Sequence, residues 1–121
     1  MKGRVLIIED DPMLVKMYQT KFGSEGFTVS TAQDGEAGLK LALQEVPNLV
    51  VLDLMMPKLP GISVLKELRS NPQTKNVPVI VLSNLSHEDE MKEAMELGAK
   101  EYLVKANFTP GQVIEKAKKY L

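Results

Sequence analysis

Residues 49–61 read LVVLDLMMPKLPG, which is a run of four apolar residues, an aspartate, and a loop with two prolines and a closing glycine. Short apolar runs without polar interruption are typical of strands that are buried on both faces of a parallel sheet. Val5–Ile8, Val79–Leu82 and the weaker Tyr102–Val104 have the same character. In Phe27–Thr31, apolar and polar residues alternate, which predicts an edge strand with one face nearer to water.

Segments with helical spacing separate these strands, and each carries one apolar stripe that we expect to be buried. The stripes consist of Leu14, Met17, Tyr18 and Phe22; Ala37, Leu41 and Ala42; Ile62, Leu65 and Leu68; Met91, Ala94 and Met95; and Val113, Ala117, Tyr120 and Leu121. The alternation of strands and helices predicts five β/α units, which form a parallel sheet with right-handed crossovers and helices on both faces.

Capping residues mark the starts of several predicted helices. Asp11 and Thr109 each precede a proline, which favours the first helical turn. Thr109 with Gln112, and Ser86 with Asp89, have the spacing of a capping box. We therefore expect Asp11 to cap a helix rather than to bind a ligand.

The size and composition of the chain narrow its function. Its 121 residues suffice for one domain, so we expect residues 1–121 to form a single domain. Fifteen basic and sixteen acidic residues give a net charge of −1, which provides no surplus of positive charge for direct nucleic-acid binding. The longest apolar run has four residues, too few for a membrane span or a signal peptide. We expect a soluble, cytoplasmic protein, consistent with the absence of cysteine.

The residues that follow the apolar runs carry the chemistry, because binding sites in open α/β sheets lie beyond the carboxyl ends of the strands. These positions hold Glu9 and Asp10 after the first strand, Asp53 after the third, Ser83 after the fourth and Lys105 after the fifth. Each residue alone has an ordinary explanation, as a loop acid, a turn serine or a surface lysine. Their coincidence at one edge of the sheet predicts a shared site.

Charge predicts what this site binds. Two carboxylates about 4 Å apart repel by about 4 kcal/mol at an effective dielectric of roughly 20. The carboxylates of Glu9, Asp10 and Asp53 together with one lysine leave a formal charge of −2, which one divalent cation cancels. Mg²⁺ fits because it binds few carboxylates and keeps waters or phosphate oxygens. In such a site Asp53 can act as the nucleophile toward a phosphoryl group and form an acyl phosphate.

Four segments, VLIIEDD, LDLMMPKLPG, VIVLSNLS and GAKEYLVK, resemble the receiver domain of two-component response regulators, and the resemblance covers essentially the whole chain. It implies the flavodoxin-like (βα)5 fold, an α/β single domain whose five-stranded parallel sheet has the order 2-1-3-4-5. It also implies a phosphorylation-dependent signalling switch that accepts a phosphoryl group on Asp53 from a histidine kinase or a phosphotransfer protein. Such a regulator is not a conventional enzyme, although it assists its own Mg²⁺-dependent phosphorylation and dephosphorylation.

The resemblance assigns a role to each residue of the predicted site. Magnesium would be bound by the carboxylates of Glu9, Asp10 and Asp53 and by the backbone carbonyl of Met55, with Asp10 as a direct ligand. Ser83 would move toward the phosphoryl group, Tyr102 would swing inward behind it, and Lys105 would pair with the phosphate. Asn84, which follows Ser83, is expected to affect the lifetime of the phosphorylated state.

Three positions depart from the family pattern. The acidic pair is Glu9–Asp10, where two aspartates are also common, and Ser83 replaces the commoner threonine while keeping the hydroxyl. Ala106 stands where the family usually has a proline, commonly after a cis peptide bond. A cis bond before alanine costs about 3–4 kcal/mol. The Lys105–Ala106 bond is therefore either trans or held under strain, and both cases would alter how Lys105 reaches the site.

No output segment follows Leu121, so we expect a chemotaxis-type, single-domain regulator that acts by binding another protein. The downstream partner is expected on the face formed by the fourth helix, the fifth strand and the fifth helix, because Ser83 and Tyr102 would couple the site to that side. An exposed Leu39 or Leu43 on the second helix would offer another contact.

Two alternative functions stay open at this point. A phosphatase of the haloacid dehalogenase type would also use Asp53 as its nucleophile, but its motif has a second aspartate where this chain has Met55. An interaction module that keeps the receiver fold but is not phosphorylated is favoured by Ala106 in place of proline. Labelling with acetyl phosphate and magnesium distinguishes the switch from the module.

Overall fold

The computed structural model describes residues 3–84 and 87–121. The strands are β1 (Arg4–Ile8), β2 (Thr28–Ala32), β3 (Leu49–Leu52), β4 (Val79–Ser83) and β5 (Glu101–Val104). The helices are α1 (Pro12–Ser24), α2 (Gly35–Glu45), α3 (Gly61–Ser70), α4 (Glu88–Glu96) and α5 (Pro110–Lys118), with a short 3-10 helix, η1 (Lys105–Asn107), before α5. All strands are parallel, in the order β2-β1-β3-β4-β5 that the family resemblance implies.

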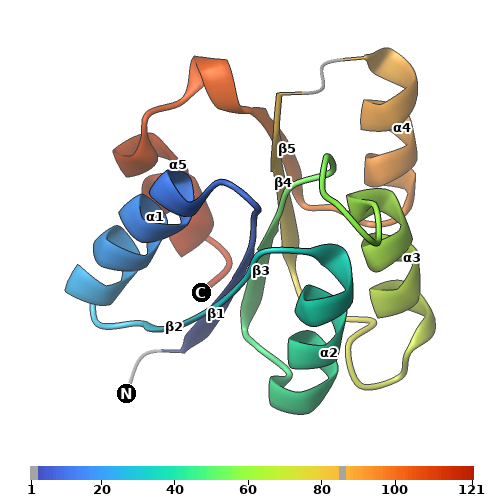
Figure 1. Ribbon diagram of the computed structural model, residues 1–121, viewed down its shortest axis with the longest axis horizontal. Coiled ribbons are helices and arrows are strands. Elements are labelled where there is room, and N and C mark those ends of the chain that lie inside the picture. The colour runs from blue at the N-terminus through green and yellow to red at the C-terminus, as the bar shows by residue number, and fades with distance from the viewer. Residues whose placement is uncertain (1–2, 85–86) are drawn as a thin grey trace.

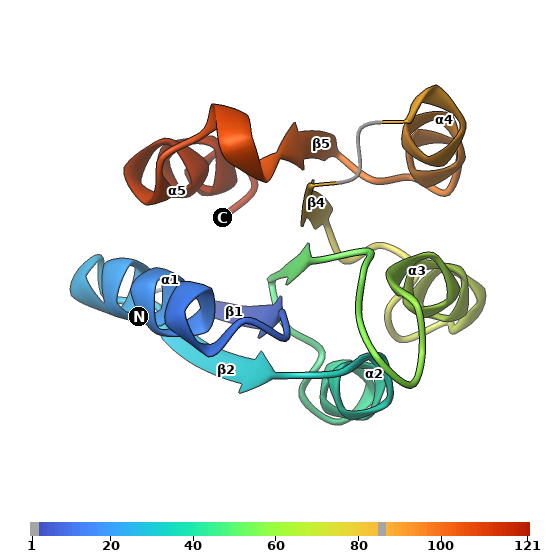
Figure 2. The same cartoon turned by 45° about the horizontal axis from the view of Figure 1, so that its top comes forward.

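Helices cover both faces of the sheet, as predicted (Figure 1). Figure 2 shows α1 and α5 on one face and α2, α3 and α4 on the other. Val5 and Ile7 of β1 pack with residues of α1 and α5, whereas Leu6 and Ile8 pack with residues of α2, α3 and α4. After Arg4, the strand has only apolar residues, and they are fully buried because both faces are covered.

The edges of the sheet are β2 and β5. The alternating strand β2 is thus an edge strand, as predicted. The prediction that Tyr102–Val104 is buried on both faces is wrong, because only Leu103 is fully buried while Tyr102 and Val104 are half-buried. An edge strand has a neighbour on one side only, so the helices beside β5 cover it less completely than they cover β4.

The buried stripes of four helices differ from the predicted ones. In α2 the predicted Ala37 is exposed, and the predicted Leu121 lies beyond the end of α5 and is 37% exposed. In α1, Val15 is buried together with Tyr18, whereas Met17 is 42% exposed. In α4, Ala94 is buried and Met95 is 47% exposed. Both α1 and α4 have apolar residues on more than one face, and only the face that contacts the sheet is buried.

Two of the predicted helix caps are present. Asp11 accepts hydrogen bonds from backbone N–H groups in the first turn of α1, and Thr109 and Gln112 form a capping box at the start of α5. The predicted box at α4 involves Ser86, which lies outside the described residues, and the residue before α4 is His87.

The expectation that Leu39 or Leu43 of α2 is exposed is wrong. Both leucines are half-buried, and Leu39 packs against the core under α2, α3 and α4. Neither leucine therefore offers an exposed apolar surface to a partner. Across residues 3–84 and 87–121, every helix is too short or too polar to cross a membrane.

Candidate functional site

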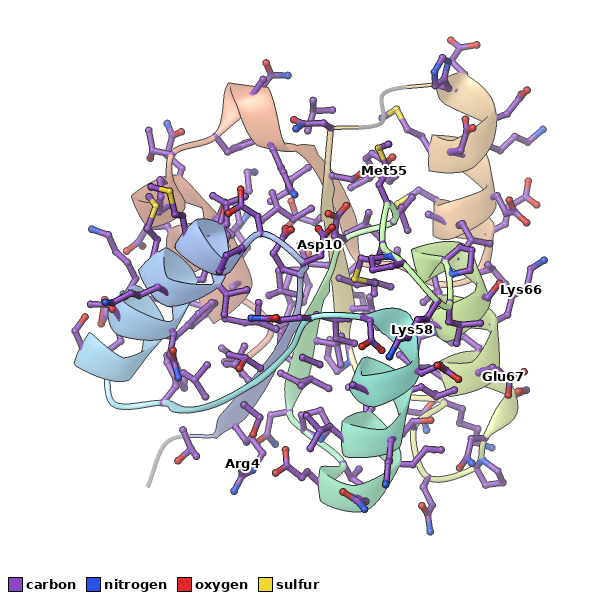
Figure 3. The ribbon with its side chains drawn as sticks, viewed as in Figure 1. Arg4, Asp10, Met55, Lys58, Lys66 and Glu67 are labelled. Carbon is purple, nitrogen blue, oxygen red and sulfur yellow. The ribbon has the colours of Figure 1, made fainter. Side chains whose placement is uncertain are left out.

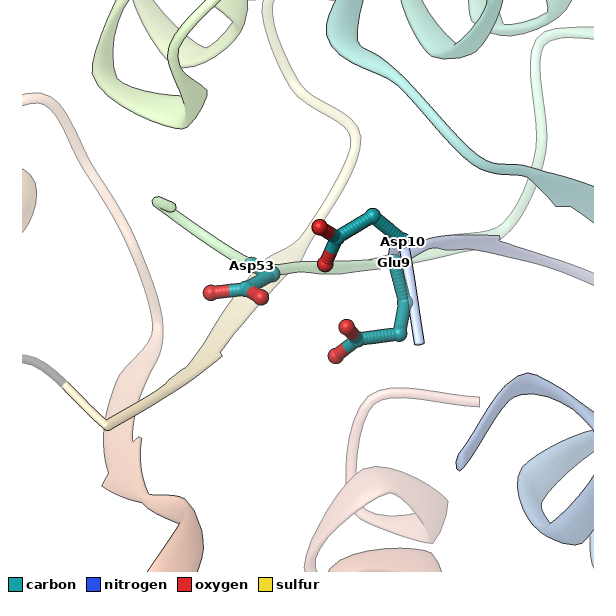
Figure 4. A group of neighbouring side chains, drawn as sticks. All are labelled: Glu9, Asp10 and Asp53. Carbon is teal, nitrogen blue, oxygen red and sulfur yellow. The ribbon is translucent and has the colours of Figure 1, made fainter. Parts of the chain in front are cut away.

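Two adjacent strands bring the predicted acids together. The backbone N–H of Glu9 donates to the Ala32 carbonyl at 2.9 Å, and that of Asp53 donates to the Ile8 carbonyl at 3.0 Å, so sheet hydrogen bonding continues past β1 and β3. Glu9 and Asp53 are 3% and 4% exposed, whereas Asp10 is exposed. Carboxylate oxygens of Glu9, Asp10 and Asp53 lie within 4.8 Å of one another (Figure 4). The three acids thus meet at the carboxyl-terminal end of the sheet, as their positions after the strands predict.

Lys105 completes this cluster with a positive charge. Its Nζ lies 2.6 Å from Glu9 Oε1 and 3.0 Å from Asp53 Oδ2. The Lys105–Ala106 peptide bond is trans, like the other peptide bonds of the described residues, and η1 begins at Lys105 directly after β5. With alanine in place of proline, the lysine still reaches both buried acids.

Backbone groups hold the second oxygen of each buried carboxylate. Glu9 Oε2 accepts from the Asp11 N–H at 3.0 Å, and Asp53 Oδ1 accepts from the Met55 N–H at 3.1 Å. Each of these two carboxylates therefore has a fixed orientation. The Met55 side chain is 55% exposed, and Figure 3 shows it at the same end of the sheet as Asp10.

Burial and charge shift the pKa values of two residues in the cluster. Burial raises the pKa of Glu9 from its ordinary value of 4.5 to about 7, although hydrogen bonds from Lys105 and the Asp11 N–H lower it. For Lys105, burial would lower the pKa, but hydrogen bonds and negative charge from Glu9 and Asp53 outweigh it and raise the pKa above its ordinary value. Lys105 is therefore an ammonium at neutral pH, whereas Glu9 exchanges its proton near neutrality.

The carboxylates of Glu9, Asp10 and Asp53 could hold a metal ion. Hard oxygen ligands of this kind suit Mg²⁺, and the chain has no cysteine and only one histidine to make a zinc site. Lys105 offsets one of the three negative charges, so a divalent cation would balance the remainder. Asp10 is exposed, which leaves the site open toward solvent.

Gly61 lets the loop after β3 return close to Asp53. Its N–H donates to the Leu54 carbonyl at 3.1 Å. A Cβ at this position would overlap the carbonyl oxygen of Asp53 and the Cα of Leu54. The glycine that ends the segment LDLMMPKLPG is therefore a steric requirement of the site.

Ser83 and Tyr102 lie beside the acid cluster on the next two strands. Ser83 ends β4 and is fully buried, and the half-buried Tyr102 packs against the core under α2, α3 and α4. Burial raises the pKa of Tyr102, the charges of Glu90 and Asp53 raise it further, and a hydrogen bond with Ser83 lowers it. The two residues predicted to act as a switch are thus in contact.

Tyr18 is a further residue near the site, which the sequence identifies only as part of an apolar stripe. It is 3% exposed. Burial raises the pKa of its phenol, and the charges of Lys105 and Glu9 act on it in opposite directions. Its hydroxyl, on a stripe of otherwise purely apolar residues, is the one feature of the sequence that could have indicated this position.

The chain is similar to known regulators over most of its length. The family model for the response regulator receiver domain matches residues 5–118. The probable transcriptional regulator ycf27 of Porphyridium aerugineum is 41% identical over 112 residues, which cover 93% of this chain and 45% of that protein. The alkaline phosphatase synthesis transcriptional regulatory protein PhoP of Bacillus subtilis (strain 168) is 38% identical over 121 residues, which cover 100% and 49%. The chain thus spans less than half of the length of these two relatives.

Solved structures agree with this relationship. The Francisella response regulator 1452 receiver domain has a TM-score of 0.88 and 34% identity, with 98% of this chain and 96% of that chain covered. Vibrio cholerae chemotaxis protein CheY4 has a TM-score of 0.91 and 26% identity, with both chains covered completely. The flavodoxin-like fold is confirmed, and the chain belongs to the response regulator receiver domain family.

Proposed function

We propose that this chain is a phosphorylation-dependent switch that accepts a phosphoryl group on Asp53 and signals by binding another protein. The observation that carries the proposal is a buried aspartate held 3.0 Å from the Lys105 ammonium, with further carboxylates of Glu9 and Asp10 within 4.8 Å. A nucleophile, a fixed cation and oxygen ligands in one place suit phosphoryl transfer. Membership of the receiver family supports the same function and gives no support to the phosphatase alternative.

The proposed donor is the phosphohistidine of a histidine kinase or a phosphotransfer protein. A carboxylate oxygen of Asp53 forms a bond to phosphorus while the bond from phosphorus to the imidazole nitrogen breaks, and the electron pair stays on the imidazole. Lys105 offsets negative charge on the transferred oxygens, and the Ser83 hydroxyl donates to one of them. Water then attacks phosphorus, which releases inorganic phosphate and restores the Asp53 carboxylate.

The proposal assigns the binding of Mg²⁺ to four groups of this chain. They are the carboxylates of Glu9, Asp10 and Asp53 and the backbone carbonyl of Met55. A bound Mg²⁺ supplies positive charge next to the phosphoryl oxygens. Glu9 also contacts Lys105 at 2.6 Å, so one side chain orients the ammonium and lies beside the cation. We propose that the domain in this way assists its own phosphorylation and dephosphorylation.

Incubation with acetyl phosphate and Mg²⁺, followed by intact-protein mass measurement, tests this function. The wild type and Asp11→Asn should each gain one phosphoryl group, because Asp11 is a helix cap. Asp53→Asn should gain none, and EDTA should prevent the gain in the wild type. If the wild type stays unlabelled while a known receiver domain is labelled in parallel, the alternative of a receiver-fold module that is not phosphorylated is correct.

We further propose that the downstream protein binds the face formed by α4, β5 and α5. The contact between Ser83 and Tyr102 supports this choice, because it links the end of β4 next to Asp53 with β5. Capture of partners with and without beryllium fluoride, a mimic of the phosphoryl group, tests the idea. A partner retained only in the presence of the mimic, and lost on substitution of exposed residues of this face, is the expected result.

The remaining expectations about the whole protein stay predictions. The absence of cysteine fits a reducing compartment, and we propose that the domain works in the cytoplasm. The net charge of −1 supports the prediction that these residues do not themselves bind nucleic acid. We likewise propose from the sequence that these residues act without contacting a membrane.

A further inference from the structure

Glu90 carries a polar atom whose place in the fold needs an explanation. It lies in the first turn of α4, four residues before Ala94, and residues at this spacing share one face of a helix. Ala94 is fully buried. Glu90 Oε2 is buried as well, and within the described part of the chain it has no hydrogen-bond donor. A buried carboxylate oxygen without a donor is unfavourable, so such an atom suggests a partner in another state of the molecule.

Tyr102 of β5 lies in the core region that the buried face of α4, with Ala94 and Glu90, covers. Helix α4 packs against β5, on the side away from α5 (Figure 2). Tyr102 and Ala94 belong to the same core region. The negative charge of Glu90 acts on the Tyr102 hydroxyl, which is hydrogen-bonded to Ser83. This hydrogen bond lowers the pKa of Tyr102, so the Ser83 hydroxyl is its donor and the Tyr102 oxygen its acceptor. The Ser83 hydroxyl has a single O–H, so it cannot donate fully to Tyr102 and to a phosphoryl oxygen at once.

We propose that Glu90 is a positioning residue of the switch, which accepts the hydrogen bond of the Tyr102 hydroxyl when Ser83 turns toward a phosphoryl group on Asp53. This inference rests on the proposed function. Once the Ser83 hydroxyl donates to a phosphoryl oxygen, it no longer holds the Tyr102 oxygen, and the Tyr102 hydroxyl can turn and donate to the Glu90 carboxylate, which needs a donor. Their pairing satisfies both groups and draws the first turn of α4 toward β5. Phosphorylation at Asp53 would thereby reach the surface of α4.

A double-mutant cycle on beryllium fluoride binding tests the pairing. The apparent dissociation constant in the presence of Mg²⁺ is measured by NMR titration for the wild type, Glu90→Ala, Tyr102→Phe and the double variant. We expect Glu90→Ala to weaken binding about fivefold when Tyr102 is present and to have no effect beside Tyr102→Phe. Glu90→Gln, which keeps an acceptor oxygen, should recover part of the affinity.

Asp89→Ala is the matched control, because Asp89 is an exposed acid in the same first turn of α4. It should bind beryllium fluoride like the wild type. Equal weakening by Glu90→Ala with and without the Tyr102 hydroxyl, or equal weakening by Asp89→Ala, would overturn the inference and leave the proposed function intact. A wild type that does not bind beryllium fluoride at all would overturn both.

Discussion

Glu9 shares the Lys105 ammonium with Asp53, and its buried carboxyl group has a pKa of about 7. At neutral pH the metal-free protein therefore contains both the protonated and the ionised form of Glu9. A cation bound at the site favours the ionised form, so protons and divalent metal compete for this residue. The competition makes Glu9 the residue through which pH acts on the site.

Without divalent metal, we expect the contribution of Glu9 to the free energy of unfolding to fall as pH rises from 4.5 to about 7. The pKa of Glu9 is higher in the folded than in the unfolded protein. Its stabilising contribution is thus complete below the unfolded value and is lost as pH rises through the folded value. The loss amounts to at most about 3 kcal/mol. Urea unfolding in EDTA across this pH range measures it.

The matched variant for this measurement is Glu9→Gln, whose amide is neutral at every pH. Its stability should lack the part of the pH dependence that Glu9 causes. Added Mg²⁺ should restore stability to the wild type at the upper end of the range, because it stabilises the ionised form. If the free energy of unfolding changes with pH in the same way in the metal-free wild type and in metal-free Glu9→Gln, the account is contradicted.

Asn84 leads to a kinetic prediction. It is exposed and directly follows the buried Ser83. We expect the Asn84 amide to hold the water that attacks the phosphoryl group, so Asn84→Ala should slow the loss of phosphate from Asp53. Decay of the phosphorylated protein after removal of acetyl phosphate measures the rate. Asn76→Ala, an exposed asparagine in the loop before β4, is the control, and equal decay in both variants would exclude a role for Asn84.

The sequence predicts which residues gather at the site but not how they contact one another. Glu9, Asp10, Asp53 and Lys105 follow apolar runs, and parallel strands bring such positions to one edge. The direct ion pair between Glu9 and Lys105 joins the residue after β1 to the first residue of η1. No local pattern encodes these tertiary details.

Among the secondary-structure elements, the end of α4 is tied to the rest of the fold by Arg69 of α3. The guanidinium donates hydrogen bonds of 2.9 to 3.4 Å to backbone carbonyls on two loops. These carbonyls belong to Leu97 and Gly98 after α4 and to Thr74, Lys75 and Val77 before β4. A cation at the carboxyl end of a helix also interacts favourably with the helix dipole.

We expect Arg69→Leu to lower the free energy of unfolding by about 2–4 kcal/mol, because the carbonyls of Leu97, Thr74 and Val77, whose hydrogen bonds are partly buried, lose a charged donor. Arg69→Lys should recover little of this loss, since an ammonium cannot reproduce the planar fork of a guanidinium. Urea unfolding measures both. Lys66→Ala is the control from the same helix, whose exposed ion pair with Glu93 should change stability by less than about 0.5 kcal/mol. Wild-type stability of Arg69→Lys would argue against the role of the fork.

The glycines of two helices allow a paired test of packing near the site. Gly61→Ala places a Cβ onto the Asp53 carbonyl oxygen, so we expect a loss of about 1–3 kcal/mol and impaired labelling of Asp53. Gly23→Ala in α1 meets no atom within 4 Å, and we expect a gain of about 0.5–1 kcal/mol. Thermal unfolding of the two variants should move in opposite directions. If Gly61→Ala leaves the stability unchanged, the loop after β3 does not pack closely against Asp53.

The elements were predictable where both faces or one clear stripe are buried, as in β1, β3 and α3. Prediction was wrong where an apolar residue has no neighbour to cover it. Val104 lies on an edge strand, and Met17 lies on the outer face of α1. An apolar side chain can be buried, but whether it is buried depends on the elements that pack against it, which are distant in the sequence.

For the whole molecule, the arrangement of the sheet separates the site from the faces that could bind partners. The acids lie at the carboxyl ends of the central strands β1 and β3, and the two residues proposed as a switch, Ser83 and Tyr102, lie on the neighbouring strands β4 and β5. Alternation of strands and helices predicts a parallel sheet with covered faces, but many strand orders satisfy it. The order came from the family resemblance, because local periodicity carries no information about which strands are neighbours.

The central claim is that Asp53 receives a phosphoryl group inside a cluster of oxygen ligands closed by Lys105. A crystal structure of the protein with Mg²⁺ and beryllium fluoride tests it most directly. The account predicts beryllium bonded to an Asp53 carboxylate oxygen, Mg²⁺ bound by Asp10 and Asp53, and Lys105 and Ser83 in contact with fluorine atoms. Beryllium fluoride bound elsewhere, or a complex in which Asp53 keeps only its contacts with Lys105 and Met55, would contradict it.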